Sequence, residues 1–134
     1  GIETHKIFHV RDGYGVKRLL AAGIEVAIIS GRDSAAVAAR MAALGVRHVF
    51  QGRDDKLPVL EALLEKLGVA PEQTAFVGDD EPDIPPMKAV ALAITVADGH
   101  PAVRAASHWV TRSGGGRGAV REVAEFLLAS RSCD

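Results

Sequence analysis

Residues 24–33 read IEVAIISGRD, and the fold depends on the pattern in this stretch. A run of aliphatic and β-branched residues ends in the polar turn SGR. The Ala-rich residues 33–44 follow, with Asp33 or Ser34 as the N-cap of a helix and Gly45 as its C-cap. The stretch therefore predicts a buried strand, a polar turn and a helix in succession.

The same succession recurs along the chain. Further strands are expected at residues 48–50, 74–77, 90–96 and 108–111, and further helices at about 12–22, 54–67, 84–89 and 119–128. Short apolar runs separated by helices are typical of a parallel sheet with helices on both faces. We therefore expect one α/β domain over residues 1–134, with a Rossmann-like sheet whose polar strand ends form the ligand-binding edge. The first ten residues alternate weakly and predict a separate strand.

Composition and charge exclude several classes of protein. The chain has 134 residues, 48% hydrophobic and 25% charged, which suits one folded domain and excludes a disordered chain. A net charge of −1 argues against a nucleic-acid partner. No apolar run approaches the roughly 20 residues that cross a bilayer, so no membrane partner is expected. With one cysteine, Cys133, no disulfide framework forms within the chain, and a cytoplasmic location is expected.

Three carboxylates within five residues follow the predicted strand at 74–77. They are Asp79, Asp80 and Asp83, in the segment VGDDEPD. Mg²⁺ is held by a few oxygen ligands and keeps several waters, so this cluster can supply one direct ligand and support for it. The alternative interpretation is that Asp80 and Asp83 only cap the next helix.

Ser30 and Lys56 are candidates for binding an anion. A hydroxyl and backbone N–H groups between a strand and a helix start suit a phosphate, although an ordinary turn would have the same sequence. Lys56 begins a predicted helix, at the end where the helix dipole disfavours a cation. This position predicts a nearby anion or carboxylate, and the alternative is a solvated surface lysine.

Further basic residues could surround a ligand with more than one anionic group. Arg32 and Arg40 are spaced to share one face of a helix, and Arg11 and Lys17 could join them. Each could also be a surface charge.

The run SGGGRGA at residues 113–119 is a poor dinucleotide fingerprint, because it lies in the last strand–helix unit. A loop that folds over a ligand, with Arg117 reaching in, is expected instead, and a plain flexible connection is the alternative.

Several segments together resemble the haloacid dehalogenase superfamily, and within it the 3-deoxy-D-manno-octulosonate 8-phosphate phosphatases. The segments are FHVRDGYGVK, EVAIISGR, LGVRHVFQG, DDKL, AFVGDDEPDIPPM, VADGHPAV and VTRSGGGRGAVREV. The resemblance implies a Mg²⁺-dependent phosphomonoesterase of lipopolysaccharide sugar synthesis, acting on a phosphorylated acidic sugar. It also implies a homotetramer, in which residues 3–10 form the second strand of an assembly hairpin.

The resemblance assigns roles by position. Asp79 becomes the metal ligand, with Asp80 and Asp83 supporting it. Ser30 and the Gly31 backbone hold the transferring phosphoryl group, and Lys56 neutralises its charge and orients the nucleophile. The residues implied to line the substrate site are His9, Val10, Arg11, Asp12, Gly13, Lys17, Arg32, Arg40 and Arg117. Lys17 stands where the family has an arginine, which keeps the charge but loses the two-pronged geometry.

The resemblance also points to a missing part. The superfamily nucleophile lies in a D-x-D motif on a first, central strand, and no D-x-D occurs in the 134 residues. That strand would lie between the strands at 24–29 and 74–77. We therefore expect an N-terminally incomplete domain with a gap in its sheet, inactive by itself. The alternatives are a non-catalytic binding or assembly domain of the same superfamily, or a phosphatase of a nine-carbon sialic-type sugar phosphate.

Overall fold

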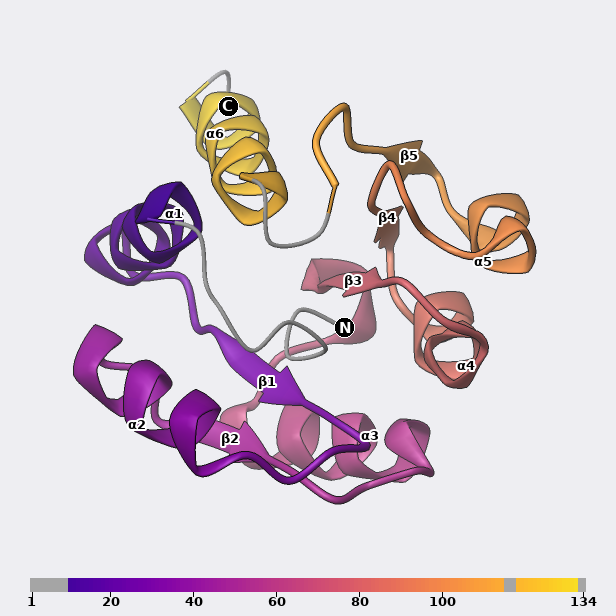
Figure 1. Ribbon diagram of the computed structural model, residues 1–134, viewed down its shortest axis with the longest axis horizontal. Coiled ribbons are helices and arrows are strands. Elements are labelled where there is room, and N and C mark those ends of the chain that lie inside the picture. The colour runs from indigo at the N-terminus through magenta and orange to yellow at the C-terminus, as the bar shows by residue number, and fades with distance from the viewer. Residues whose placement is uncertain (1–9, 115–117, 133–134) are drawn as a thin grey trace.

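Strands and helices alternate along the chain in the computed structural model, which describes residues 10–114 and 118–132 (Figure 1). The strands are β1 (Ala27–Ile29), β2 (His48–Phe50), β3 (Ala75–Gly78), β4 (Leu92–Thr95) and β5 (Trp109–Val110). The α-helices are α1 (Val10–Ala21), α2 (Ala35–Leu44), α3 (Lys56–Leu67), α4 (Ile84–Ala89), α5 (Pro101–Ala106) and α6 (Ala119–Ser132). Two 3₁₀ helices, η2 (Pro71–Gln73) and η3 (Glu81–Asp83), flank β3. No described helix is long and apolar enough to cross a membrane.

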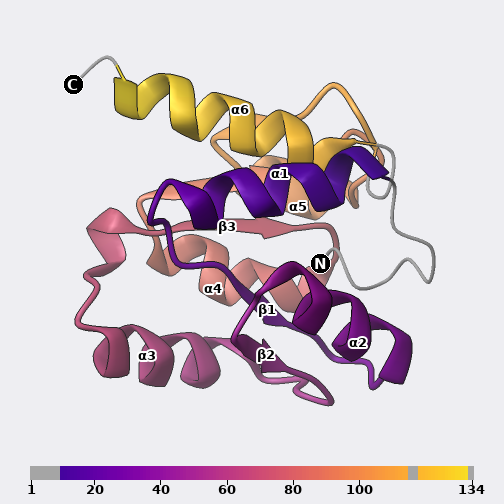
Figure 2. The same cartoon turned by 90° about the vertical axis from the view of Figure 1, so that its left-hand side faces the viewer.

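Helices cover both faces of the strands, as the apolar strand pattern predicts. Ile28 packs into a cluster with residues of α1, α2 and α6, whereas Ile29 packs against Leu60 of α3. Neighbouring residues of a strand point to opposite faces, which explains this division. Phe76 of β3 contacts the cluster around Ile29 and also the cluster around Met87 of α4. The result is three layers, with α1, α2 and α6 on one side and α3, α4 and α5 on the other (Figures 1 and 2).

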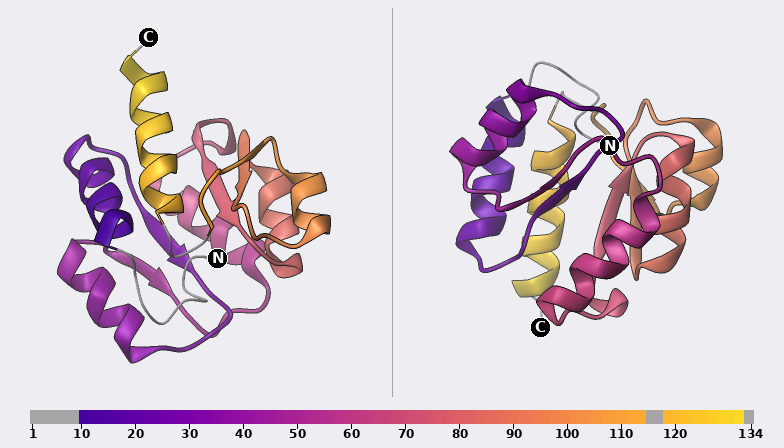
Figure 3. Two further views of the ribbon diagram at one scale, coloured as in Figure 1. Left: turned by 45° about the horizontal axis from the view of Figure 1, so that its top comes forward. Right: turned by 90° about the horizontal axis from the view of Figure 1, so that it is seen from below.

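The strands form two parallel sheets instead of one. One sheet contains β1 and β2, and the other has the order β3-β4-β5. Within the described residues no strand pairs with β1 on the side of β3, and no strand pairing joins the two sheets. The α3 side of the core, where Leu60 and Phe76 meet, links the two sheets (Figure 3). Each sheet carries one half of the candidate site, because Ser30 follows β1 and Asp79 follows β3.

The strands are shorter than the apolar runs suggest. The run at 24–29 becomes a strand only over Ala27–Ile29, because β2 offers just three residues for pairing. The run at 90–96 likewise narrows to Leu92–Thr95, which matches the length of β3. A strand is defined by its paired backbone, so apolar residues beyond the partner's end are not part of the ladder.

One further expectation is wrong, and one helix was missed. Val10, expected in an N-terminal strand, begins α1, and the rest of that expected strand lies outside the described residues. Helix α5 was not predicted, because Val103 is the one large apolar residue among its six, PAVRAA, and does not mark an apolar face. It begins at Pro101, and the His100 ring accepts a hydrogen bond from the Ala102 N–H at 3.1 Å.

Helices α1 and α6 lie side by side, and Gly15 of α1 packs against the backbone of α6 (Figures 1 and 2). A Cβ atom there would lie 2.8 Å from the Cα of Arg121 and 3.1 Å from the carbonyl oxygen of Val120. Since both are backbone atoms, Gly15→Ala must push the helices apart. We expect it to lower the free energy of unfolding by about 1–3 kcal/mol in chemical denaturation, although alanine favours helix more than glycine does.

Gly13→Ala, in the same helix, is the matched control. A Cβ at Gly13 would meet the guanidinium end of Arg40, which can rotate away. This substitution should therefore leave the free energy of unfolding unchanged or raise it slightly. Equal destabilisation by the two substitutions would contradict the close helix contact at Gly15.

Candidate active site

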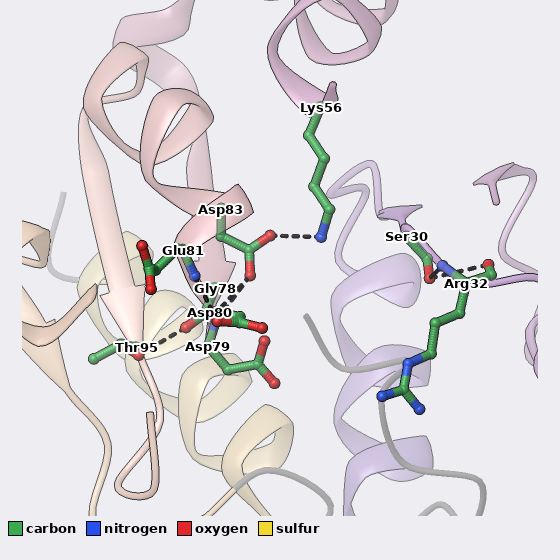
Figure 4. A network of polar contacts seen from close by, with 9 residues as sticks. All are labelled: Ser30, Arg32, Lys56, Gly78, Asp79, Asp80, Glu81, Asp83 and Thr95. Atoms are coloured by element: carbon green, nitrogen blue, oxygen red, sulfur yellow. Dashed lines mark hydrogen bonds and ion pairs between the residues drawn. The ribbon is translucent and has the colours of Figure 1, made fainter. Parts of the chain in front are cut away.

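A buried ion pair lies at the centre of the candidate site. Lys56, the first residue of α3, places its Nζ atom 2.6 Å from Oδ1 of Asp83 (Figure 4). The two side chains are only 5% and 1% exposed. The expectation of a carboxylate near Lys56 is confirmed, and the solvated-lysine interpretation is wrong. Asp83 compensates for placing a cation at the start of a helix.

The Asp83 carboxyl is ionised although it is buried. Burial alone would raise the pKa of Asp83, because it disfavours a charged carboxylate. Nearby positive charge, that of Lys56 included, and hydrogen bonds from Lys56 and the Asp79 N–H together outweigh this and hold the pKa of Asp83 below its ordinary value of 3.8. Asp83 is therefore a carboxylate throughout the neutral range.

Asp83 also shapes the turn that follows β3. Its Oδ2 accepts hydrogen bonds from the N–H groups of Asp79, at 2.9 Å, and Asp80, at 3.3 Å. Asp80 caps η3 by accepting from the Glu81 N–H at 2.8 Å. The capping interpretation thus holds for both residues at η3, where Asp80 accepts from the Glu81 N–H and Asp83 closes a capping box by accepting from the Asp80 N–H. Capping is not the only role of Asp83, because it also joins Lys56 to the Asp79 turn.

Asp79 is the carboxylate that can reach a ligand. It lies directly after β3, is partly buried, and points away from Asp83 (Figure 4). The described residues contain no group of three or more His, Cys, Asp or Glu side chains that could hold a metal by themselves. Mg²⁺ does not need one, because it is usually held by one or two carboxylates together with waters and phosphate oxygens. The donor set around Asp79 therefore fits Mg²⁺.

The other half of the site is the turn after β1. Ser30 is fully buried, and its Oγ accepts from the Arg32 N–H at 3.0 Å and donates to the Arg32 carbonyl oxygen at 3.2 Å. The hydroxyl thus closes a local turn, as the ordinary-turn interpretation expects. Figure 4 shows Lys56 between this turn and the Asp79 turn. The phosphate role of Ser30 stays a prediction.

The predicted pairing of Arg32 with Arg40 on one helix is wrong. Helix α2 begins at Ala35, because the Ser34 side chain accepts from the Val37 N–H at 3.2 Å and caps it. Arg32 therefore lies in the turn before the helix, exposed, with its side chain extending away from Ser30 (Figure 4).

The remaining substrate candidates are only partly placed. The guanidinium of Arg40, which is partly buried, lies against Gly13 of α1, so two of them are in contact. Lys17 is exposed one turn further along α1. Residues Val10, Arg11 and Asp12 belong to the first turn of that helix. The predictions for His9 and Arg117 lie outside the described residues.

Two residues at this edge were missed by the sequence reasoning. Thr95, fully buried at the end of β4, donates from Oγ1 to the Gly78 carbonyl oxygen at 2.7 Å and so fixes the end of β3. The backbone N–H of His100 donates to the Asp79 carbonyl oxygen at 3.0 Å. A threonine in an otherwise aliphatic strand was the one available signal for Thr95. Nothing local marked His100, since its contact joins two separate loops.

Comparison with known proteins identifies the chain at two levels. A family model described as haloacid dehalogenase-like hydrolase matches residues 14–91, more than half of the chain. The chain therefore belongs to the haloacid dehalogenase-like hydrolases. It is 50% identical over 129 residues to 3-deoxy-D-manno-octulosonate 8-phosphate phosphatase KdsC of Escherichia coli K12, covering 96% of this chain and 69% of that protein. Within the class, the chain is a member of the 3-deoxy-D-manno-octulosonate 8-phosphate phosphatase family.

Solved structures agree with this assignment. The phosphatase of the same name from Yersinia pestis superposes with a TM-score of 0.92 at 46% identity, covering 94% of this chain and 68% of that one. The Moraxella catarrhalis phosphatase, solved with magnesium ion, phosphate ion and KDO, gives a TM-score of 0.90 at 44% identity, covering 92% of this chain and 71% of that one.

Proposed function

We propose that this protein is a Mg²⁺-dependent phosphatase that hydrolyses 3-deoxy-D-manno-octulosonate 8-phosphate to the free sugar acid and phosphate. The observation that carries the proposal is the buried Lys56–Asp83 pair, which joins the Ser30 side of the site to the Asp79 turn. A cation, a helix start and carboxylates in this arrangement suit a phosphate held beside a metal ion. The named relatives support the choice of sugar, and they do not favour a non-catalytic domain or a nine-carbon substrate.

Each of the site residues has its own role in binding the phosphoryl group. The Ser30 hydroxyl exchanges its bond to the Arg32 carbonyl oxygen for one to a phosphoryl oxygen, and the Gly31 N–H donates beside it. The Lys56 ammonium neutralises the charge of the group and orients the nucleophile. Asp79 ligates Mg²⁺, while Asp80 and Asp83 hold the turn that aims it. The bound ion supplies charge stabilisation to the phosphoryl oxygens.

Basic residues recognise the rest of an acidic sugar. The residues assigned to this part of the site are His9, Val10, Arg11, Asp12, Gly13, Lys17, Arg32, Arg40 and Arg117. The contact of Arg40 with Gly13 supports a shared surface for at least two of them.

The nucleophile is proposed to be an aspartate outside these 134 residues. Its carboxylate attacks phosphorus, the bond from phosphorus to the sugar oxygen breaks, and a second aspartate gives that oxygen a proton. Water then hydrolyses the aspartyl phosphate. Two observations support this proposal: no D-x-D motif occurs in the sequence, and the sheet is divided between β1 and β3. A strand between them would complete the single domain, and residues 1–134 alone are expected to be inactive.

The proposal also covers the oligomeric state, the pathway and the cellular location. We infer a homotetramer, as in the family that the sequence resembles, and a place in lipopolysaccharide sugar synthesis. The single cysteine supports a cytoplasmic location.

The test uses the protein isolated from its source. Its denatured intact mass should exceed 14.1 kDa. It should release phosphate from 3-deoxy-D-manno-octulosonate 8-phosphate, lose that activity in excess chelator, and regain it with Mg²⁺. Its kcat/KM should be higher on this substrate than on a nine-carbon sialic-type sugar phosphate. A protein of 14.1 kDa that binds phosphosugar without turnover would replace this proposal by a non-catalytic domain.

A further inference from the structure

The turn after β1 is joined to the turn after β2 by a series of backbone hydrogen bonds. The Ser30 N–H donates to the Phe50 carbonyl oxygen at 2.8 Å, and the Arg53 N–H donates to the Ser30 carbonyl oxygen at 2.9 Å. The Gly52 N–H donates to the Arg32 carbonyl oxygen at 3.2 Å. The conformation of the Ser30 turn therefore depends on a neighbouring loop as well as on its own sequence.

The side chain of Gln51 completes this connection. Its Oε1 accepts from the Ser34 N–H at 2.6 Å, and its Nε2 donates to the Ser34 carbonyl oxygen at 3.2 Å. An acceptor must face the N–H and a donor must face the carbonyl, so these contacts define the orientation of the amide. Gln51 directly follows β2 and is partly buried, which restricts it to this arrangement.

Ser34 is the residue at which the Ser30 turn ends and α2 begins. The N–H of an N-cap residue precedes the helix and has no partner within it. The Ser34 hydroxyl already accepts from the Val37 N–H, and its carbonyl oxygen accepts from the Ala38 N–H at 3.1 Å. The Gln51 amide thus supplies the partner that the helix cannot give, and it fixes both backbone polar groups of Ser34.

We infer that Gln51 is a positioning residue for the phosphate-binding turn. It holds Ser34 in place, so that residues 30–34 are fixed at both ends, by β1 and by the anchored start of α2. Donors fixed in advance bind an anion more tightly than donors that must be ordered on binding. This inference rests on the proposed function, because the turn needs this rigidity only if it binds phosphate.

The test compares Gln51→Met with Gln73→Met in the full protein. Methionine keeps the length of the side chain and removes both polar groups. Gln73 is the matched control, because its amide oxygen also accepts a backbone N–H, that of Ala70 at 3.1 Å. It is the last residue of η2, at the opposite end of β3 from Asp79. Two quantities are measured in each variant: the dissociation constant of inorganic phosphate, from amide chemical-shift titration, and the hydrogen-exchange rate of the Ser34 amide.

Gln51→Met should speed exchange at Ser34 and weaken inorganic phosphate binding by about tenfold, the upper range for one lost hydrogen-bonding partner. Gln73→Met should leave both quantities within about twofold of the wild type. Phosphate affinities that are equal in the two variants would overturn the role of Gln51. A wild-type protein that binds no phosphate would overturn the proposed function, and this inference with it. The two failures are distinguishable, because the second shows in the wild type.

Discussion

Lys56→Met is expected to lower the free energy of unfolding by about 3–5 kcal/mol, the usual cost of removing one partner from a buried ion pair. The Asp83 carboxylate would keep the N–H groups of Asp79 and Asp80 but lose the ammonium that compensates for its burial. A domain of this size has a total stability of only about 5–15 kcal/mol. Urea denaturation should therefore show a large fall in the midpoint.

Lys66→Met is the control for this result. Lys66 lies in the last turn of the same helix and is exposed, so its removal should change the free energy of unfolding by less than about 0.5 kcal/mol. Replacing both members of the pair, as Lys56→Met with Asp83→Leu, should cost less than the sum of the single changes, because no buried charge is left alone. A Lys56 variant as stable as the Lys66 variant would contradict the buried pair.

The pH dependence of stability gives a second check on the same pair. The folded-state pKa of Asp83 lies below its ordinary value of 3.8, so the ionised group contributes stability above that pH. This contribution is lost as the pH falls through the folded-state pKa. As the pH falls below about 5 and through the folded-state pKa, the wild type should lose more stability than Lys56→Met, which lacks the ion pair to begin with.

Asp79→Asn is expected to reduce Mg²⁺-dependent phosphate release by about a hundredfold to a thousandfold, the range for removing one charge-stabilising group from a reaction centre. The amide keeps the size of the side chain but removes the charge that attracts the ion. Because Asp83 rather than Asp79 holds the turn together, the fold should tolerate the change. Steady-state kinetics over a range of Mg²⁺ concentrations would show the loss.

Glu72→Gln offers a control, since it also converts a carboxylate to its amide, but at an exposed position. It lies in η2, before β3, whereas Asp79 follows that strand. Its activity and its Mg²⁺ requirement should match those of the wild type. Full activity in Asp79→Asn, with an unchanged Mg²⁺ requirement, would remove Asp79 from the metal site.

The parts of this structure that the sequence predicted well are those with local causes. The apolar run ending at Ile29 and the glycine at position 45 specify a strand and a helix end through residues next to them. The carboxylate near Lys56 was also predictable, because a lysine at a helix start needs an anion. The sequence could not show that Asp83 supplies this carboxylate. Lys56 begins the helix after β2 and Asp83 ends the 3₁₀ helix after β3, so only the fold brings them together.

The errors have a similar explanation. Arg32 was placed on a helix because its spacing to Arg40 fits one, but the Ser34 cap starts the helix after Arg32. The apolar run at 24–29 did not reveal how much of it would be paired, because that length is set by β2. Gln51 carried no signal at all, since its partner Ser34 is brought near by the parallel pairing of β1 with β2.

The pairing of α1 with α6 has a consequence for the order in which the protein folds. The two helices come from opposite ends of the described chain, whereas the strands of each pair are joined by one or two short helices. Closing a longer loop costs more chain entropy, and contacts between distant segments slow folding. We therefore expect the strand–helix–strand units to form early and the contact at Gly15 to form last. The rate of reaching the native state is then set by the meeting of two helices on the side of the protein, and not by the residues of its reaction centre.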